Sequence, residues 1–370
     1  MEWAFWVCVG FILYTYAGYP LWLLACTRLR PRPVCKAEVT PHVSFIVAAR
    51  NEAANLPAKI ENLLSVDYAA DRLEVIVASD GSTDATNAIL GQWSDPRVRA
   101  VILEEHQGKA VALNHAVAAA RGDILVFTDA RQKIEPGAVK QLVANLADPA
   151  VGAVSGELMI GDGSAVTGAG LYWNIEKKIR QWESQTGSVV GATGALYAVR
   201  RELATPFPAG AILDDVYLPK QVARQGRRVV FEPQARVWDP WVTTSREEYR
   251  RKVRTLTGNY QLLQLAPWLL GPGNPLWFRL ISHKLLRLAM PFALAALLVT
   301  SAVLVSTPVY AAAFVLQVLF YGSALLSAWW GGLGLVGRMA HVAWSFVMLN
   351  AAAMSALFHF LSGRRQVWVR

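Results

Sequence analysis

Both ends of this chain are apolar over stretches long enough to cross a lipid bilayer, whereas the middle is polar. Residues 3–26 are almost uncharged, and residues 288–360 are nearly all apolar. A membrane-crossing helix needs about 20 such residues. The sequence therefore predicts one transmembrane helix at 1–27 and about three within 285–361, at Leu285–Ser306, Val309–Trp330 and Leu335–Leu361. A large buried helical core is less favoured, because core helices seldom lack a polar face.

Basic residues lie next to these apolar segments and contribute to a net charge of +9. An excess of Lys and Arg marks the cytoplasmic side of a membrane protein. We therefore expect an integral protein of the plasma or inner membrane with its middle part in the cytoplasm, in contact with anionic lipids. Nucleic acid is not an expected partner, because no basic aromatic patch occurs away from the spans. The flanking residues are Arg28, Arg30, Arg32 and Lys36 after the first span, and Arg279, Lys284 and Arg287 before or at the start of the second.

The charge rule conflicts with the C-terminal tail at 362–370. Three spans that start inside would leave Arg364, Arg365 and Arg370 outside. Either one apolar segment is re-entrant or interfacial, or the tail departs from the rule. Both alternatives stay open.

Between the spans, short apolar runs alternate with helical patterns. This alternation predicts βαβ units with a mostly parallel, Rossmann-like sheet. A linker at 28–42 precedes this α/β domain at 43–245, and interfacial, amphipathic helices are expected at 246–284. The predicted strands are Val43–Ala48, Leu73–Ala78, Val98–Leu103 and Ile124–Phe127, and the predicted helices are Leu56–Leu64, Asp84–Trp93 and Lys109–Ala120.

Three acidic signatures occur in order in this domain: DGSTD at 80–84, FTDAR at 127–131 and the pair Asp214-Asp215. The first two follow predicted strands directly. Because the carboxyl ends of parallel strands meet at one edge of an open α/β sheet, the carboxylates of these two should share a crevice, and the third signature could complete the site from the far side. The alternative is that they serve as helix caps or helix N-termini, where acidic residues are common.

Seven short motifs together resemble the membrane-embedded family 2 glycosyltransferases with a GT-A fold, the group that includes cellulose, chitin and hyaluronan synthases. The resemblance covers about residues 43–265 and the flanking spans. Each motif alone is weakly specific, and their order and spacing carry the resemblance. The motifs are IVAARNE at 46–52, DGSTD at 80–84, GKA at 108–110 with Leu113-Asn114, FTDA at 127–130, TGA at 193–195, LDD at 213–215 and RKVR at 251–254.

The resemblance implies a role for each matching residue on the donor side. Glu52 and Asp80 would contact the nucleoside, and Lys109 would lie close to the diphosphate. Asp129 matches the first carboxylate that holds a divalent cation, and Mg²⁺ or Mn²⁺ suits such oxygen ligands. Arg254 would contact the diphosphate of the leaving nucleotide.

On the acceptor side, the resemblance makes Asp215 the general base that takes a proton from the acceptor hydroxyl. Asp214 would raise the pKa of this base by repulsion, or else hydrogen-bond the backbone. The small residues at Thr193 and Gly194 would let a sugar acceptor approach closely.

Two positions depart from the family pattern. Arg131 stands where a second metal-binding Asp is usual. Either the cation has one carboxylate ligand from this motif, or Arg131 itself neutralises the charge of the phosphates. The polymer synthases also have Gln-x-x-Arg-Trp where this chain has RKVRT at 251–255. The absent Gln and Trp weaken the case for an elongating synthase.

The sequence thus predicts a membrane-bound, inverting glycosyltransferase that uses a nucleotide sugar, with UDP as the expected nucleotide. Synthesis of an exported or cell-surface polysaccharide ranks first. Single-sugar transfer to a lipid acceptor, such as a polyprenyl phosphate or sphingolipid, is the alternative, and a non-catalytic partner of an active synthase is another. A homo-oligomer and an export partner are open alternatives as well.

Overall fold

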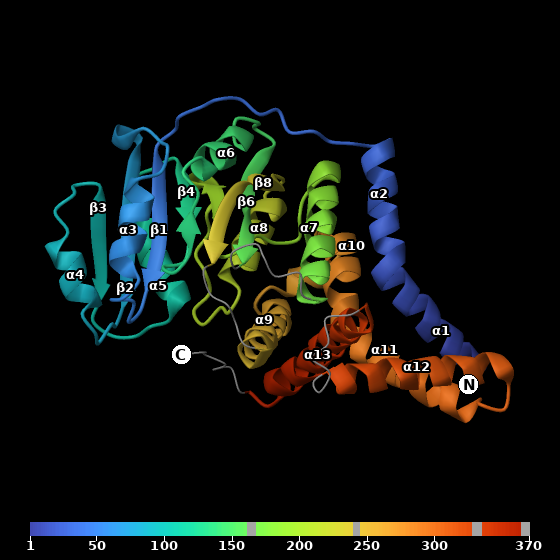
Figure 1. Cartoon of the computed structure of the whole chain (residues 1–370). Helices are drawn as coiled ribbons and strands as arrows, with labels where there is room; N and C mark the ends of the chain where they lie inside the picture. The colour runs from blue at the N-terminus through green and yellow to red at the C-terminus, as the bar shows by residue number, and fades with distance from the viewer. Residues whose placement is uncertain (161–167, 240–244, 328–334, 364–370) are drawn as a thin grey trace.

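The computed structural model describes residues 1–160, 168–239, 245–327 and 335–363. It consists of an α/β part built on one sheet and a group of long helices from both ends of the chain, which come together in space (Figure 1). The basic residues Arg364, Arg365 and Arg370, on which the topology conflict rests, lie outside the described ranges.

The α/β part contains one eight-stranded sheet with the order β3-β2-β1-β4-β7-β6-β8-β5. β1 pairs in parallel with β2 and β4, and β2 pairs in parallel with β3. The second half is mixed, because β7 runs antiparallel to β4 and β6. The strands are β1 (Val43–Ala49), β2 (Leu73–Asp80), β3 (Val98–Leu103), β4 (Ile124–Phe127), β5 (Lys133–Ile134), β6 (Val151–Ile160), β7 (Tyr197–Arg200) and β8 (Arg228–Asp239).

Helices cover both faces of the sheet, which is why its central strands are continuously apolar. Phe45 and Val47 of β1 point to one face, and Ile46 between them points to the other. The first face packs against α3 (Leu56–Leu64) and α6 (Ala138–Asn145), and the second against α5 (Lys109–Ala119) and α8 (Asp214–Arg224). α4 (Thr86–Gln92) lies beside α3 and β3.

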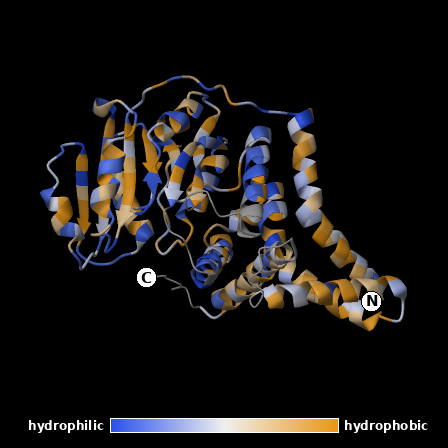
Figure 2. Ribbon diagram, viewed as in Figure 1, coloured by the Kyte–Doolittle hydropathy of each residue, from blue (hydrophilic) through white to orange (hydrophobic). Residues whose placement is uncertain are grey.

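Within the described residues, four helical stretches are long and apolar enough to cross a membrane. They form the orange segments away from the sheet in Figure 2. The first joins α1 (Glu2–Leu13), a π turn at Tyr14–Gly18 and α2 (Tyr19–Leu29). The second joins α10 (Trp277–Leu280), a π turn at Ile281–Leu285 and α11 (Leu286–Val303), and α12 (Pro308–Ser327) and α13 (Leu335–Leu361) follow.

The second apolar stretch begins at Trp277, inside the region expected to form interfacial helices, rather than at 285. Charged residues did not end this helix, because they are partly buried and have partners in the α/β part. Arg279 donates hydrogen bonds to the backbone oxygen of Ser188 and to the hydroxyl of Thr186, and Lys284 pairs with Glu176.

Two helices of the α/β part attach it to the apolar helices. α2 packs against α7 (Gly168–Thr186), and α13 packs along α9 (Ser245–Leu265) on one side and α12 on the other. In Figure 1, α9 and α13 lie below the part of the sheet that contains β6 and β8. This places the edge of the sheet, α7, α9 and α13 around one space.

Gly81, directly after β2, provides a test of this arrangement. Its φ is +60°, and an added Cβ would lie 2.3 Å from the backbone nitrogen of His106. We expect Gly81→Ala to lower the free energy of unfolding by about 1–3 kcal/mol through strain and displacement of this loop. Thermal unfolding in detergent measures the change.

Gly91→Ala is the matched control, because Gly91 lies in α4 with open space around its Cα. Alanine is the better helix residue by up to about 1 kcal/mol. This variant should be as stable as the parent or more so. Equal effects at the two positions would contradict the described loop packing.

Candidate active site

A cavity of about 1170 Å³ lies between the carboxyl edge of the sheet and the helices α7, α9 and α13. Its wall includes Lys109, Asp129, Asp214 and Asp215 from the α/β part. It also includes Phe346 and other residues of the apolar helices. A single space therefore connects the acidic signatures with the membrane-type helices.

Lys109 joins two of the three acidic signatures. Its Nζ lies 3.0 Å from Oδ1 of Asp129 and 3.2 Å from Oδ1 of Asp214. Gly108, with a φ of +97°, precedes it and lets α5 begin at Lys109. The N-terminus of α5 therefore faces the cavity beside a lysine, an arrangement suited to phosphate.

These charges shift one another's pKa values. Burial by itself would lower the pKa of Lys109, but Asp129 and Asp214 outweigh it, and the net shift is upward. Burial would raise the pKa of Asp129, but Lys109, with Lys59 and Arg254, holds it below its usual value. Both groups are thus charged at neutral pH.

Asp215 is in the opposite situation. Burial is the largest cause that raises its pKa from 3.8 to about 7, and the neighbouring Asp214 carboxylate adds to it. Lys109 and the hydrogen bond from the backbone N–H of Gly194 to Oδ2, at 2.8 Å, only partly offset this. A carboxylate with a pKa near neutrality is suited to accept a proton.

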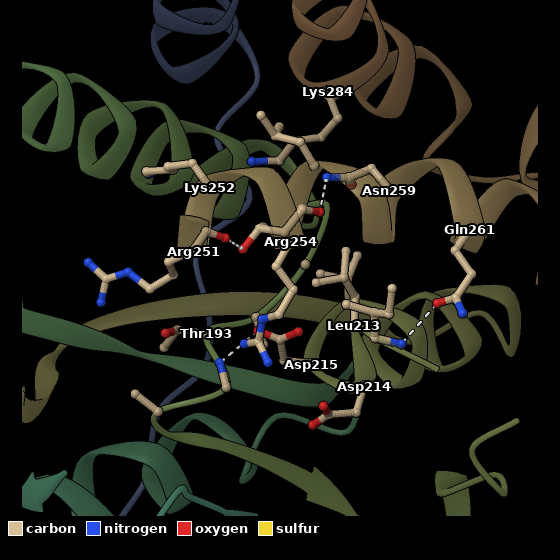
Figure 3. Close-up of a pocket in the computed structure, with 18 of the residues that line it drawn as sticks. Thr193, Leu213, Asp214, Asp215, Arg251, Lys252, Arg254, Asn259, Gln261 and Lys284 are labelled. Atoms are coloured by element: carbon tan, nitrogen blue, oxygen red, sulfur yellow. Dashed lines mark hydrogen bonds between the residues drawn. The ribbon is translucent and has the colours of Figure 1, made fainter. Parts of the chain in front are cut away.

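The expected acceptor residues and Arg254 reach the same region. Thr193, Gly194 and Arg254 line the cavity, and Gly194 is so close that an added Cβ would lie 3.2 Å from Oδ2 of Asp215. In Figure 3, Arg254 extends from α9 toward Asp215. Arg131 also lines the cavity, at the position of the missing second Asp.

Asp80 and Glu52 do not line the cavity. Asp80 is 3% exposed, and its carboxylate accepts hydrogen bonds from the backbone N–H groups of Gln107 and Gly108 and lies 2.7 Å from Nδ1 of His106. It therefore holds the loop that leads into Lys109. Glu52 accepts a hydrogen bond from the side chain of Asn55. Their contact with a nucleoside stays a prediction.

Lys59 lies behind the site, where it supports the segment that carries Asp129, and this role was not predicted from sequence. It is 3% exposed, and its Nζ donates to the hydroxyl of Thr128 and to the backbone oxygen of Gln132, on either side of Asp129. Burial lowers its pKa to about 7, against the attraction of Asp129. A lysine at an apolar position of the predicted helix Leu56–Leu64 was the available signal.

The residues around Asp129 are compatible with a divalent cation. The Asp129 side chain is 37% exposed toward the cavity and supplies hard oxygen ligands. In the described part of the chain, no group of three or more His, Cys, Asp or Glu side chains is arranged to hold a metal. Such a cation would therefore have Asp129 as its protein ligand and take other ligands from substrate phosphates and water, as Mg²⁺ often does.

The raised pKa of Asp215 predicts a pH-dependent stability. Between pH 3.8 and about 7 the folded protein keeps a proton that the unfolded chain releases, so stability falls as pH rises. Above pH 7 the ionised Asp215 costs about 4 kcal/mol. Asp215→Asn removes this cost, so the variant should have a higher melting temperature than the parent at pH 8 and a smaller advantage at pH 5.

Differential scanning fluorimetry with a metal chelator present measures both differences. The backbone N–H of Gly194 can still donate to the amide oxygen of asparagine. The raised pKa of Asp215 would be contradicted by a variant that is less stable than the parent at pH 8, or by one whose melting temperature changes equally at both pH values.

Comparison with known proteins extends over the α/β part and beyond. The pattern of the family described as Glycosyl transferase family 2 matches residues 44–205. A "Probable glycosyltransferase YdaM" of Bacillus subtilis is 30% identical over 233 residues, which are 59% of this chain and 55% of that protein. A poly-beta-1,6-N-acetyl-D-glucosamine synthase of Staphylococcus aureus is 24% identical over 243 residues, 64% of this chain and 58% of the synthase. The chain thus spans little more than half the length of these relatives.

A solved structure matches over nearly the whole chain. It is a mannosyltransferase from Pyrobaculum calidifontis in complex with GDP-Man and Mn²⁺, with a TM-score of 0.75 and 25% identity. The alignment covers 97% of this chain and 99% of that one, apolar helices included. The expected GT-A fold is confirmed. Over residues 44–205 this chain is thus similar to the family 2 glycosyltransferases.

Proposed function

We propose that this protein is a membrane-bound, inverting glycosyltransferase that transfers a sugar from a nucleotide diphosphate sugar to an acceptor hydroxyl. The observation that carries the proposal is the single cavity in which Lys109, Asp129 and Asp215 meet. Two of these groups suit a metal-bound diphosphate, and the third suits proton removal. The resemblance of the whole chain to a solved mannosyltransferase supports this assignment of roles to the three residues.

The donor diphosphate fits the end of the cavity at α5. Lys109 and the N-terminus of α5 supply positive charge there, and Asp129 would hold the cation that neutralises the phosphates. Mn²⁺ is supported by the solved relative, and Mg²⁺ has the same ligand preference. UDP follows from the family resemblance, whereas GDP is the nucleotide in that relative.

Asp215 would act as the base. Its carboxylate accepts the proton of the acceptor hydroxyl while that oxygen forms a bond to the anomeric carbon. The bond from the anomeric carbon to the diphosphate breaks at the same time, and the departing negative charge meets Lys109 and Arg254. Attack from the face opposite the leaving group inverts the configuration. Asp214, held by Lys109, keeps the pKa of Asp215 raised.

The four apolar helices support an integral membrane location with the α/β part in the cytoplasm. The basic residues Arg28, Arg30, Arg32 and Lys36 follow the first apolar helix, as the charge rule requires of a cytoplasmic flank. α13, which packs along α9, is the best candidate for the interfacial segment that the charge rule calls for.

We favour a lipid-borne acceptor and single addition over polymer synthesis, which reverses the ranking from sequence. Tyr16, Phe346 and Leu349 from the apolar helices line the same cavity as Asp215. An acceptor anchored in the membrane could therefore reach the base directly. Polysaccharide synthesis remains the second candidate, because the Staphylococcus aureus relative is a polysaccharide synthase by name.

Asp215→Asn tests the chemistry. We expect the turnover number for sugar transfer to fall about 10²- to 10⁴-fold, the usual contribution of a general base. Binding of the nucleoside diphosphate with Mn²⁺, measured by calorimetry, should stay within about twofold of the parent.

Asp71→Asn is the control, because this aspartate is 82% exposed and does not line the cavity. It should retain parental turnover. Full activity of Asp215→Asn would show that the base is another group. A parent protein that neither binds nor hydrolyses any common nucleotide sugar would support the non-catalytic alternative instead.

The length of the product distinguishes the two acceptor classes. Membranes that contain the protein are supplied with radiolabelled nucleotide sugar, and the product is extracted into organic solvent and sized. A lipid-soluble product with one added sugar supports single addition. A ladder or a long water-soluble polymer would restore polysaccharide synthesis as the first candidate.

A further inference from the structure

The backbone segment 193–195 is hydrogen-bonded at both ends to parts of the proposed active site. The backbone N–H of Gly194 donates to Oδ2 of Asp215 at 2.8 Å. The backbone oxygen of Ala195 accepts a hydrogen bond of 2.8 Å from the hydroxyl of Thr128, which directly follows β4. One short segment is therefore fixed both to the base and to the end of β4.

The buried Lys59 determines the direction of the Thr128 hydrogen bond. Its Nζ lies 2.8 Å from the Thr128 hydroxyl and 2.7 Å from the backbone oxygen of Gln132. An ammonium group has donors and no acceptor, so the hydroxyl must accept from Lys59. The single hydrogen of the hydroxyl is then free to point at Ala195. A lysine on α3 thus keeps the hydroxyl in the orientation that holds segment 193–195.

The same ammonium group supports the loop that carries Asp129. Thr128 precedes Asp129 and Gln132 follows it, and both contact Nζ of Lys59. Asp129 itself lines the cavity and pairs with Lys109, whereas Lys59 and Thr128 do not line the cavity. Lys59 and Thr128 therefore act on the site through their neighbours and not by touching a substrate.

Packing alone does not explain a lysine at this position. Lys59 is 3% exposed, and both of its hydrogen-bond partners are neutral groups. Burial of an ammonium group among neutral partners costs free energy. Methionine would fill a similar space without this cost. The ammonium group is better explained by the two groups that it holds.

The contact between Thr128 and Ala195 begins where strand pairing ends. β4 and β7 pair as strands as far as Phe127 and Tyr197, and beyond them no strand pairing fixes the two backbones. The remaining hydrogen bonds of segment 193–195 come from other elements, such as the one from the backbone N–H of Thr193 to the hydroxyl of Ser155 on β6. The Thr128 hydroxyl is thus the side-chain link from this segment to the loop of Asp129.

Sugar transfer requires the two sides of the reaction to stay in register. The cation near Asp129 would hold the diphosphate and, through it, the anomeric carbon, whereas Asp215 would hold the attacking hydroxyl. An error of about 1 Å in such an arrangement can cost a factor of about 100 in rate. A rigid connection between the two carboxylates therefore has a direct effect on turnover.

We propose that Lys59 and Thr128 are positioning residues for sugar transfer. Through segment 193–195 they keep the base Asp215 at a fixed distance from the cation ligand Asp129. This proposal rests on the proposed function and adds the connection between its two halves. Lys59 orients the Thr128 hydroxyl, and that hydroxyl holds the segment whose backbone N–H binds the base.

Thr128→Val and Thr128→Ser test the hydroxyl. Valine has a similar shape but no hydroxyl, so the turnover number should fall about 10- to 100-fold. Binding of the nucleoside diphosphate with Mn²⁺ should stay within about twofold of the parent, because Asp129 and the contact of Lys59 with Gln132 remain. Serine keeps the hydroxyl and should restore most of the turnover. Turnover is measured in membranes that contain the full chain, as sugar transferred from UDP-glucose, UDP-N-acetylglucosamine or GDP-mannose.

Thr300→Val is the matched control. The hydroxyl of Thr300 is buried and donates to the backbone oxygen of Ala296 within α11, away from the cavity wall. This variant should have the turnover of the parent. The proposal would be overturned by parental turnover in Thr128→Val, by an equal loss in Thr128→Ser, or by an equal loss in the control.

Lys59→Met tests the lysine. It releases both Gln132 and Thr128, so turnover and Mn²⁺-dependent nucleotide binding should each fall about tenfold or more. Adding Thr128→Val to Lys59→Met should reduce turnover little further, because both changes break the same connection. Losses that multiply in the double variant would show that the two residues act separately and would overturn the proposal. Should Lys59→Met fail to fold, the comparison of Thr128→Val with Thr128→Ser decides.

Asp215→Asn separates this proposal from the proposed function. If the parent transfers sugar and Asp215→Asn does not, while Thr128→Val has parental turnover, only the positioning role fails. If Asp215→Asn keeps full activity, or the parent transfers no sugar from any of the three donors, the proposed function fails and the positioning role fails with it.

Discussion

The ion pairs of Lys109 hold the site together. This ammonium group links Asp129, after β4, to Asp214, at the start of α8. β4 belongs to the parallel half of the sheet, whereas α8 lies between β7 and β8 of the mixed half, so the contact joins residues that are far apart in sequence. Removing the ammonium would leave two carboxylates close together beside Asp215, with part of their compensation lost.

The same interaction explains why Asp215 differs from its neighbours. Lys109 favours the charged form of Asp129, whereas at Asp215 burial and the repulsion of Asp214 outweigh both Lys109 and the hydrogen bond from the backbone N–H of Gly194. Two carboxylates of the same cavity thus have different roles. Asp129 stays ionised and can bind a cation, whereas Asp215 can accept a proton near neutral pH. This arrangement lowers the stability of the folded protein when Asp215 is ionised.

Much of the α/β part could be predicted from sequence, because strands buried on both faces read as short apolar runs. The helix Leu56–Leu64 and the strands Val98–Leu103 and Ile124–Phe127 have the predicted bounds. The carboxyl-edge rule also predicted the place of Asp129, whereas Asp214 reaches the same cavity from the start of α8. What could not be predicted depends on long-range contacts. Asp80 was expected in the crevice, but it is satisfied by the loop before Lys109.

The apolar helices show the same limit. Lys284 and Arg287 read as a cytoplasmic flank of a span, whereas the structure turns them onto Glu176 of α7. Nothing in the local sequence indicates that residues 108 and 111 positions apart will pair. Lys59 was overlooked because a lysine on a short amphipathic helix is ordinarily solvated, and its burial depends on the backbone around Gln132. Composition indicated the membrane anchor, but tertiary structure made its charges part of the cavity.

The position of a bound metal ion tests the central claim most directly. Crystals of the protein grown with a nucleoside diphosphate and Mn²⁺ would be measured at the manganese absorption edge. The account predicts an anomalous peak within coordination distance of an Asp129 oxygen, with the diphosphate beside Lys109. A peak bound by other residues, or a diphosphate away from the N-terminus of α5, would contradict it.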